Sequence, residues 1–274
     1  MMKERTMNGT DAKAEQEERD DIFELIKAML VAAFIAVTIR TFLFEPFNIP
    51  SSSMYPTLLV GDYLFVEKYS YGYSRYSFPL GMGGFDGRIL EKQPARGDIA
   101  VFRLPSNTRV DYIKRIVGLP GDRLQMIEGV LHINGKAVPR EYLGTQDMAD
   151  GNAIHVFSKY LERLPDGAAH KIFELTDEEM HDETPVYIVP DGHYFAMGDN
   201  RDMSLDSRVS DKVGFIPAEN LVGRAAFLFF STEGITDQCQ KEGALAAVKT
   251  VGCWFATVPG AIRYDRIFKS VSSL

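Results

Sequence analysis

The hydrophobic and polar positions divide the chain into one long apolar segment followed by many short alternating ones. The apolar segment, residues 22–44, reads IFELIKAMLVAAFIAVTIRTFLF and carries its charged residues near the two ends. A helix of about 20 apolar residues crosses a bilayer, and long basic side chains near its ends can reach the interface. A buried amphipathic core helix is the alternative. We predict a single transmembrane helix at residues 22–44.

Residues 1–21 are polar and charged, and we predict a cytoplasmic tail there. A cleaved signal peptide is disfavoured, because this tail is long and acidic and no small-x-small cleavage site is evident. Basic residues preceding a transmembrane segment favour the cytoplasmic side. The N-terminus is therefore expected in the cytoplasm and the rest of the chain outside it. The basic residues in question are Lys3, Arg5, Lys13 and Arg19.

From residue 60 onward the pattern is typical of β-strands. Runs of Val, Ile, Tyr and Phe are cut by Pro-Gly, Asn-Gly and Asp-Gly pairs, and Asn134-Gly135 predicts a tight hairpin turn. The predicted fold is mainly β: a transmembrane helix followed by an extracytoplasmic antiparallel sheet or barrel-like domain. The clearest strands are expected at 62–69, 98–104, 111–119, 185–189, 193–198 and 221–230.

The β domain is predicted to comprise residues 45–139 and 186–232, with 140–185 as a smaller insertion of weaker pattern. Within the insertion the acidic run TDEEMHDE suggests a short helix or a loop. Residues 72–95 suggest a surface loop. The C-terminal segment 233–274 mixes Trp, Phe and Ile with Lys and Arg, which suits either a segment on the membrane surface or a docking helix.

Composition and cysteine content narrow the class of protein. The chain is 45% hydrophobic, which is enough for a core, and its net charge of −8 argues against a nucleic-acid partner. Cys239 and Cys253 suit one disulfide or two buried thiols equally well, and they are too few for a zinc site.

Three polar clusters interrupt the apolar pattern: the serines at 51–53, Lys114 within a strand, and residues 198–208. Because side chains alternate along a strand, Lys114 shares a face with Tyr112 and Ile116. Burial there would lower the pKa of the amine, and a shift to about 8 requires roughly 3 kcal/mol. A neutral lysine can then act as a base toward a serine. Considered separately, these residues have ordinary explanations: Lys114 as a solvent-facing lysine, and the serines at 51–53 as a helix cap or a turn.

Four stretches taken together are far more specific than any one of them. In this order, and directly after an apolar helix, they resemble the bacterial type I signal peptidases (leader peptidases, family S26), which are membrane-anchored serine proteases with a Ser-Lys dyad. The resemblance covers nearly the whole chain beyond the first 20 residues. The stretches are RTFLFEPFNIPSSSMYPTLLVGDYLFVEK (40–68), RGDIAVF (96–102), DYIKRIVGLPGD (111–122) and GHYFAMGDNRDMSLDSR (192–208).

This resemblance implies a role for particular residues. Ser53 corresponds to the nucleophile, Lys114 to the general base and Ser51 to a donor of the oxyanion hole. Ser52 departs from the pattern, in which a small residue such as Gly is common, but serine is also small. No metal or other cofactor is implied. The supporting residues implied are Ser204, which hydrogen-bonds the lysine, together with Asp199, Asp206 and Arg208, which hold the site by polar contacts.

The same resemblance implies a substrate and a location. Secreted precursors with small residues at −1 and −3 would be cleaved through an acyl-enzyme at the cytoplasmic (inner) membrane. An extended peptide can add to a sheet edge and place alternate side chains in pockets, and the segment with Phe47 and Ile49 is the candidate edge. The implied partners are signal-peptide precursors, membrane lipid and the protein export machinery, without nucleic acid.

Three alternatives remain to be weighed against the structure. A Ser-His-Asp hydrolase could use His193 and Asp199, although no Gly-x-Ser-x-Gly motif surrounds any serine. A metal site in GDNRDMSLD lacks the spacing and the glycine of a calcium loop. A membrane-anchored β domain that only binds partners would be expected to have lost Ser53 or Lys114.

Overall fold

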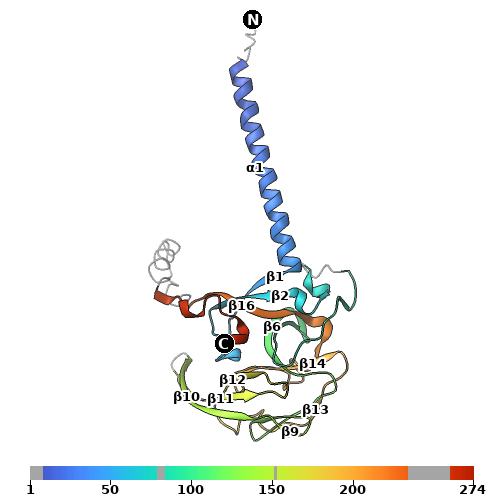
Figure 1. Ribbon diagram of the computed structural model, residues 1–274, viewed down its shortest axis with the longest axis vertical. Coiled ribbons are helices and arrows are strands. Elements are labelled where there is room, and N and C mark those ends of the chain that lie inside the picture. The colour runs from blue at the N-terminus through green and yellow to red at the C-terminus, as the bar shows by residue number, and fades with distance from the viewer. Residues whose placement is uncertain (1–8, 79–83, 151–152, 234–259) are drawn as a thin grey trace.

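The protein is a long N-terminal helix joined to a group of antiparallel β-sheets, in a computed structural model that describes residues 9–78, 84–150, 153–233 and 260–274. Helix α1, Gly9–Phe42, projects away from the sheets and joins them at its C-terminal end (Figure 1). Its stretch Asp21–Phe42 has a mean hydropathy of 2.3, and none of its apolar window is buried in the protein. By length and composition this helix can cross a membrane, as predicted for residues 22–44.

The helix begins earlier than the sequence pattern suggested. Residues from Gly9 onward, assigned to a polar tail, continue the same helix. Seven of the 13 residues at 9–21 are Ala, Glu, Lys or Gln, which have high helix propensity, but the segment has no apolar face. Hydrophobic periodicity therefore could not detect it.

The largest sheet has seven strands in the order β1-β2-β16-β5-β6-β14-β15, and every neighbouring pair is antiparallel. The strands predicted at 62–69, 98–104, 111–119, 193–198 and 221–230 all lie in it, so the mainly β fold is confirmed. Within the described residues its end strands do not pair, and the sheet is not closed into a barrel. In sheet order the strands are Phe44–Asn48, Asp62–Glu67, Leu221–Ser231, Ile99–Leu104, Asn107–Gly118, His193–Met197 and Ile216–Pro217.

Two smaller sheets flank the large one. Asn134 and Gly135, both with positive φ, make the two-residue turn between β8 and β9, as the Asn-Gly pair predicted. The predicted surface loop 72–95 contains the short pair β3 (Tyr73–Ser74) and β4 (Arg88–Ile89). The other small sheet has the order β13-β7-β8-β9, with strands Tyr187–Ile188, Arg123–Ile127, Val130–Ile133 and Lys136–Ala137.

The insertion predicted at 140–185 has more regular structure than its sequence suggested. It forms a three-stranded antiparallel sheet of β10 (Arg140–Asp150), β11 (Ala153–Arg163) and β12 (Ala169–Glu174), followed by the acidic run as a loop. Large apolar side chains such as Ile154, which is 71% exposed, lie in solvent on this sheet, so it lacks a simple alternation of buried and exposed residues. Figure 1 places this sheet at the end of the molecule opposite α1.

The described part of the C-terminal segment, residues 260–274, packs along β16. Backbone bridges join Phe227 to Ser270 and Thr232 to Ile262, and Val271 is buried. Beyond Ala261 these residues form short 3₁₀ turns, Tyr264–Arg266 and Val271–Ser273. The remainder of the segment, including Cys239 and Cys253, lies outside the described residues.

Candidate active site

The serine cluster forms a tight turn where β1 leaves the main sheet. Ser52–Met54 is one turn of 3₁₀ helix, and Ser51 precedes it with an extended backbone. Ile49 and Met54 on either side are buried in the core beneath β2 and β5, which fixes the turn on the sheet. The Ser53 side chain is therefore held at the edge of the core, with only 7% of the residue exposed.

Lys114 reaches this serine from the middle of β6. Its Nζ lies 2.6 Å from Ser53 Oγ, and the lysine is 4% exposed. Burial lowers the pKa of Lys114 to about 8, although the carboxylates of Asp206 and Asp199 oppose the shift; Arg208 reinforces it. A buried amine with this pKa is uncharged in a substantial fraction of molecules near neutral pH and can accept a proton.

The remaining member of the predicted reaction centre, Ser51, lies close by. The hydroxyl of Ser51 is 3.3 Å from Ser53 Oγ, and Ser51 is exposed. The ring of Tyr112, on the face of β6 that Lys114 shares, has its centroid 5.3 Å from Lys114 Nζ. The structure thus brings together three residues, Ser51, Ser53 and Lys114, from two separate segments.

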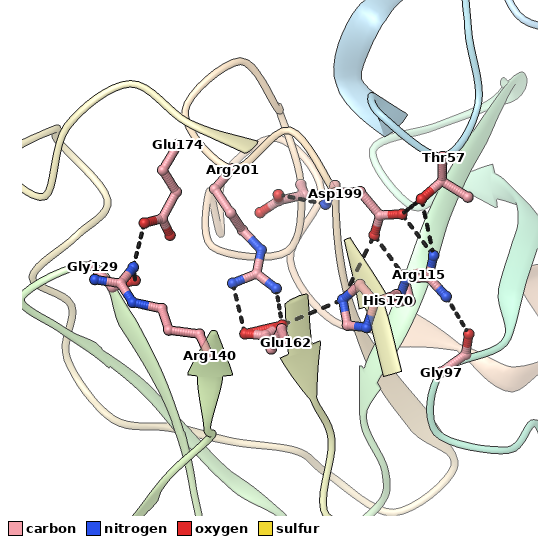
Figure 2. Close-up of polar contacts among 12 residues, drawn as sticks. Thr57, Gly97, Arg115, Gly129, Arg140, Glu162, His170, Glu174, Asp199 and Arg201 are labelled. Atoms are coloured by element: carbon pink, nitrogen blue, oxygen red, sulfur yellow. Dashed lines mark hydrogen bonds and ion pairs between the residues drawn. The ribbon is translucent and has the colours of Figure 1, made fainter. Parts of the chain in front are cut away.

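Asp199 anchors the neighbouring arginine. Arg115 follows Lys114 on β6, so its side chain points to the opposite side of the strand. There it binds the Asp199 carboxylate through Nε at 2.7 Å and Nη2 at 2.6 Å, and Thr57 Oγ1 also donates to Asp199 (Figure 2). Burial would raise the pKa of Asp199, but Arg115 outweighs it and holds that pKa below its ordinary value.

The loop 198–208 is fastened to the nucleophile through its backbone. The Asn200 N–H donates to the Ser53 carbonyl at 3.1 Å, and the Asn200 side-chain amide donates to the Ser52 carbonyl at 3.2 Å. Gly198 lies so close that a Cβ there would collide with the Ser53 carbonyl and with Ser204. Displacement of this loop would therefore move Ser53.

A second ion pair closes the loop on itself. Arg208 Nε and Nη2 each donate to the Asp206 carboxylate at 2.9 Å, and the Gly198 N–H donates to the same carboxylate at 3.0 Å. Asp206 is fully buried; burial would raise its pKa, but Arg208 keeps it low. Asp206 and Arg208 therefore tie the two ends of the loop together by polar contacts.

Ser204 does not make the contact expected of it. It is buried beside Gly198, but its hydroxyl makes no hydrogen bond of normal geometry to any described residue. The expected bond to Lys114 is absent from this structure. Lys114 Nζ instead has Ser53 Oγ as its hydrogen-bond partner.

Sequence reasoning missed a further group of buried charges that joins the inserted sheet to this loop. Arg201 binds Glu162 of β11 with both terminal nitrogens, and His170 Nε2 of β12 is 3.3 Å from the same carboxylate (Figure 2). His170 Nε2 also lies 3.9 Å from Asp199 Oδ1. Glu162 and His170 stand in ordinary strand sequence, so no motif marked them.

The two other reaction centres considered do not form. His193 has its Nδ1 2.9 Å from the Asp191 carbonyl, whereas the Asp199 carboxylate is taken by Arg115 and Thr57. In the part of the chain that the structure describes, no three His, Cys, Asp or Glu side chains gather as metal ligands. Asp202, for example, accepts the Leu175 N–H at 2.6 Å.

Comparison with known proteins gives the family. The model of the family described as signal peptidase, peptidase S26, matches residues 22–230. Signal peptidase I of Rickettsia typhi (strain ATCC VR-144 / Wilmington) is 42% identical over 249 residues, covering 86% of this chain and 89% of that protein. The chain belongs to the signal peptidase family, peptidase S26.

Other relatives agree with this assignment. Signal peptidase I of Rickettsia conorii (strain ATCC VR-613 / Malish 7) is 39% identical over 283 residues, covering 99% of this chain and 98% of that protein. The signal peptidase I family removes signal peptides, and the chain is therefore a peptidase, that is, a hydrolase. A crystal structure of a signal peptidase I from Enterococcus faecalis V583 is 27% identical and covers 48% of this chain and 97% of its own, with a TM-score of 0.29.

Proposed function

We propose that the protein is a membrane-bound serine endopeptidase that removes signal peptides by a Ser53–Lys114 dyad. Neutral Lys114 Nζ takes the proton of Ser53 Oγ, which attacks the scissile carbonyl carbon. The tetrahedral intermediate collapses as Lys114 returns this proton to the leaving amine, and an ester on Ser53 remains. Lys114 then deprotonates a water molecule, which hydrolyses the ester and frees Ser53.

Ser51 and the Ser53 N–H are the proposed donors to the oxyanion. The Ser51 hydroxyl lies beside Ser53 Oγ, at 3.3 Å, where the carbonyl oxygen of an attacked peptide would be close to it. Losing one such donor typically lowers kcat by about 10²–10³. Asp199, Asp206 and Arg208 are assigned the supporting role of holding the loop against Ser53, and Ser204 packs within that loop.

Substrate specificity for small residues at −1 and −3 is assigned to the strand edges beside Ser53. Among the described residues β1 pairs on one side only, with β2, and β6 pairs with β14 only from Arg115 onward, so its earlier residues have one open edge. An extended substrate can therefore add to these edges. Phe47 and Ile113 are partly buried and pack against the core cluster that contains Ile49, and they are the proposed walls for small alternate side chains.

The location proposed is the cytoplasmic (inner) membrane, with α1 as the single span, the N-terminus in the cytoplasm and the β domain outside. The unburied apolar helix Asp21–Phe42 ends eleven residues before Ser53, which supports a nucleophile near the membrane surface. Precursors held in the same bilayer by their signal peptides would meet the site at high effective concentration. Membrane lipid and the export machinery are the expected neighbours.

The distance of 2.6 Å between a buried lysine and Ser53 is the single observation that carries this proposal. The test incubates the detergent-solubilised full-length protein with a precursor bearing Ala-x-Ala before its cleavage site, and identifies the product by mass. Ser53→Ala and Lys114→Met should each lose activity by at least about 10³-fold, and His193→Gln, which alters a partly exposed histidine, should retain it. Product from Ser53→Ala at the wild-type rate would rule out the dyad.

A further inference from the structure

A cavity of about 460 Å³ adjoins the serine turn and is not used by the proposed mechanism. One wall consists of the turn itself, including Ser51, Ser52 and Tyr55. The other wall consists of Met203 from the loop 198–208 and of Met148 and His155 from the inserted sheet. No described residue of β1 or β6 lines it, so it is separate from the strand edges assigned to the −1 and −3 residues.

The inserted sheet places its two residues here by direct pairing. Met148 of β10 and His155 of β11 are cross-strand partners, and the sheet is joined to the loop 198–208 by the Phe173 N–H, which donates to the Asp199 carbonyl at 2.8 Å. The position of this wall relative to Ser53 is therefore set by the same loop that holds the nucleophile. It is a built surface rather than a gap between independent parts.

We propose that this cavity binds the first residues of the mature chain, on the leaving side of the scissile bond. The inference rests on the proposed function and extends it to the part of the substrate after the cleavage site. If the acyl side of the substrate lies along β1 and β6, the part after the scissile bond continues past Ser53 and away from these strands. Ser51 and Ser52, next to Ser53, line the cavity, so this part of the substrate can enter it. An extended peptide advances about 3.3 Å per residue, so residues +1 to +3 span about 10 Å from the reacting carbonyl.

The lining defines which side chain fits best. Tyr55, Met148 and Met203 present apolar surface, and methionine adapts to side chains of different shape. Ser51, Ser52, His155 and Asn200 add polar atoms to the lining, but none of its described residues is Asp, Glu, Lys or Arg, so a charged side chain would lose hydration there without gaining a partner of fixed charge. The cavity therefore favours an apolar residue over glycine, and glycine over a charged residue, at one of the positions +1 to +3.

Cleavage of matched peptides measures this preference directly. All peptides share one acyl side ending in Ala-x-Ala and carry Gly at +1 to +3, with a single Leu or Asp placed at each position in turn. At the position that enters the cavity, the wild-type protein should cleave the Leu peptide with a kcat/KM about tenfold above that of the all-Gly peptide. Asp at that position should lower kcat/KM below the all-Gly value.

Two variants tie the preference to the cavity. Met148→Ser combined with Met203→Ser removes apolar lining and should reduce the Leu-to-Gly ratio to about twofold. Met148→Trp fills the cavity and should reduce the same ratio. Because Met148 is partly exposed, this substitution should leave the hydrophobic core intact. Met180→Ser makes the same change at a methionine that is 85% exposed and does not line the cavity, and it should leave the ratio unchanged.

The outcomes separate this inference from the function on which it rests. If no peptide is cleaved, the proposed function fails. If the all-Gly peptide is cleaved but the wild type shows no preference at +1 to +3, or if the ratio in Met148→Trp equals that of the wild type, the cavity does not bind the mature chain. A lower Leu-to-Gly ratio in either cavity variant, with the Met180→Ser ratio unchanged, supports the assignment.

Discussion

The pKa of Lys114 sets a pH profile that can be calculated before it is measured. Burial lowers this pKa from 10.5 to about 8, a shift that corresponds to about 3 kcal/mol. At pH 8 about half of the molecules then carry the neutral amine, whereas an ordinary lysine would be neutral in roughly 1 of 300 molecules. Burial thus raises the active fraction by about two orders of magnitude.

The assay is kcat/KM for an Ala-x-Ala peptide between pH 5 and pH 10. Because the base works only when neutral, activity should be present above the pKa and lost as pH falls. We expect a plateau above about pH 8 and a tenfold loss per pH unit below it, so that activity at pH 6 is about 100-fold below the plateau.

Two substitutions should move this acidic limb in opposite directions. Asp206→Asn removes a carboxylate that raises the pKa of Lys114, and the limb should move to lower pH. Arg208→Gln removes a cation that lowers this pKa, and the limb should move to higher pH. A substitution that only damages the fold would lower the plateau, but it would not move the acidic limb in opposite directions in the two variants. A limb near pH 10, or one near pH 6.5 that disappears in His170→Gln, would refute the assignment of Lys114 as the base.

Three further predictions concern the same structure. Lys114→Met should raise the free energy of unfolding at pH 7 by about 1–3 kcal/mol, because the buried ammonium is removed. The free energy of unfolding of the wild type should itself rise between pH 8 and pH 10.5, where the unfolded chain binds more protons than the folded one; urea titration measures both effects. Gly198→Ala should lower kcat by about 100-fold, because a Cβ collides with the Ser53 carbonyl, whereas KM for a short peptide should change less. Glu162→Gln should cost about 3–5 kcal/mol in urea unfolding, because the buried guanidinium of Arg201 loses its partner.

The parts of the site that the sequence predicted are those encoded by local pattern. The long apolar run predicted the apolar helix at Asp21–Phe42, and strand alternation placed Lys114 on a face with Tyr112. Nothing local, however, brings Ser53 to Lys114, because β1 and β6 are separated by three strands in the main sheet. Only the four stretches taken together, through their resemblance to a family, predicted that contact.

The hydrophobic pattern of the sequence could not predict the inserted sheet, for a physical reason. A strand shows alternation when one face is buried and the other is wet. In β10 successive residues are exposed, such as Tyr142 at 57% and Leu143 at 44%, so apolar and polar residues follow each other without a period of two. Glu162 and His170 are buried by ionic contacts with the distant loop 198–208, and no pattern of apolar residues reports such contacts.

The surroundings of Lys114 explain how a lysine can be discharged next to two aspartates. A free carboxylate at either position would stabilise the ammonium and return its pKa toward the ordinary value. Each carboxylate is instead bound by an arginine through two nitrogens, Asp199 by Arg115 and Asp206 by Arg208. Arg208 offsets part of the effect of Asp206 on the lysine, and burial remains the dominant influence on its pKa. The Asp206–Arg208 pair therefore fixes the loop against Ser53 and also helps keep the base uncharged, so loss of Arg208 should weaken both effects at once.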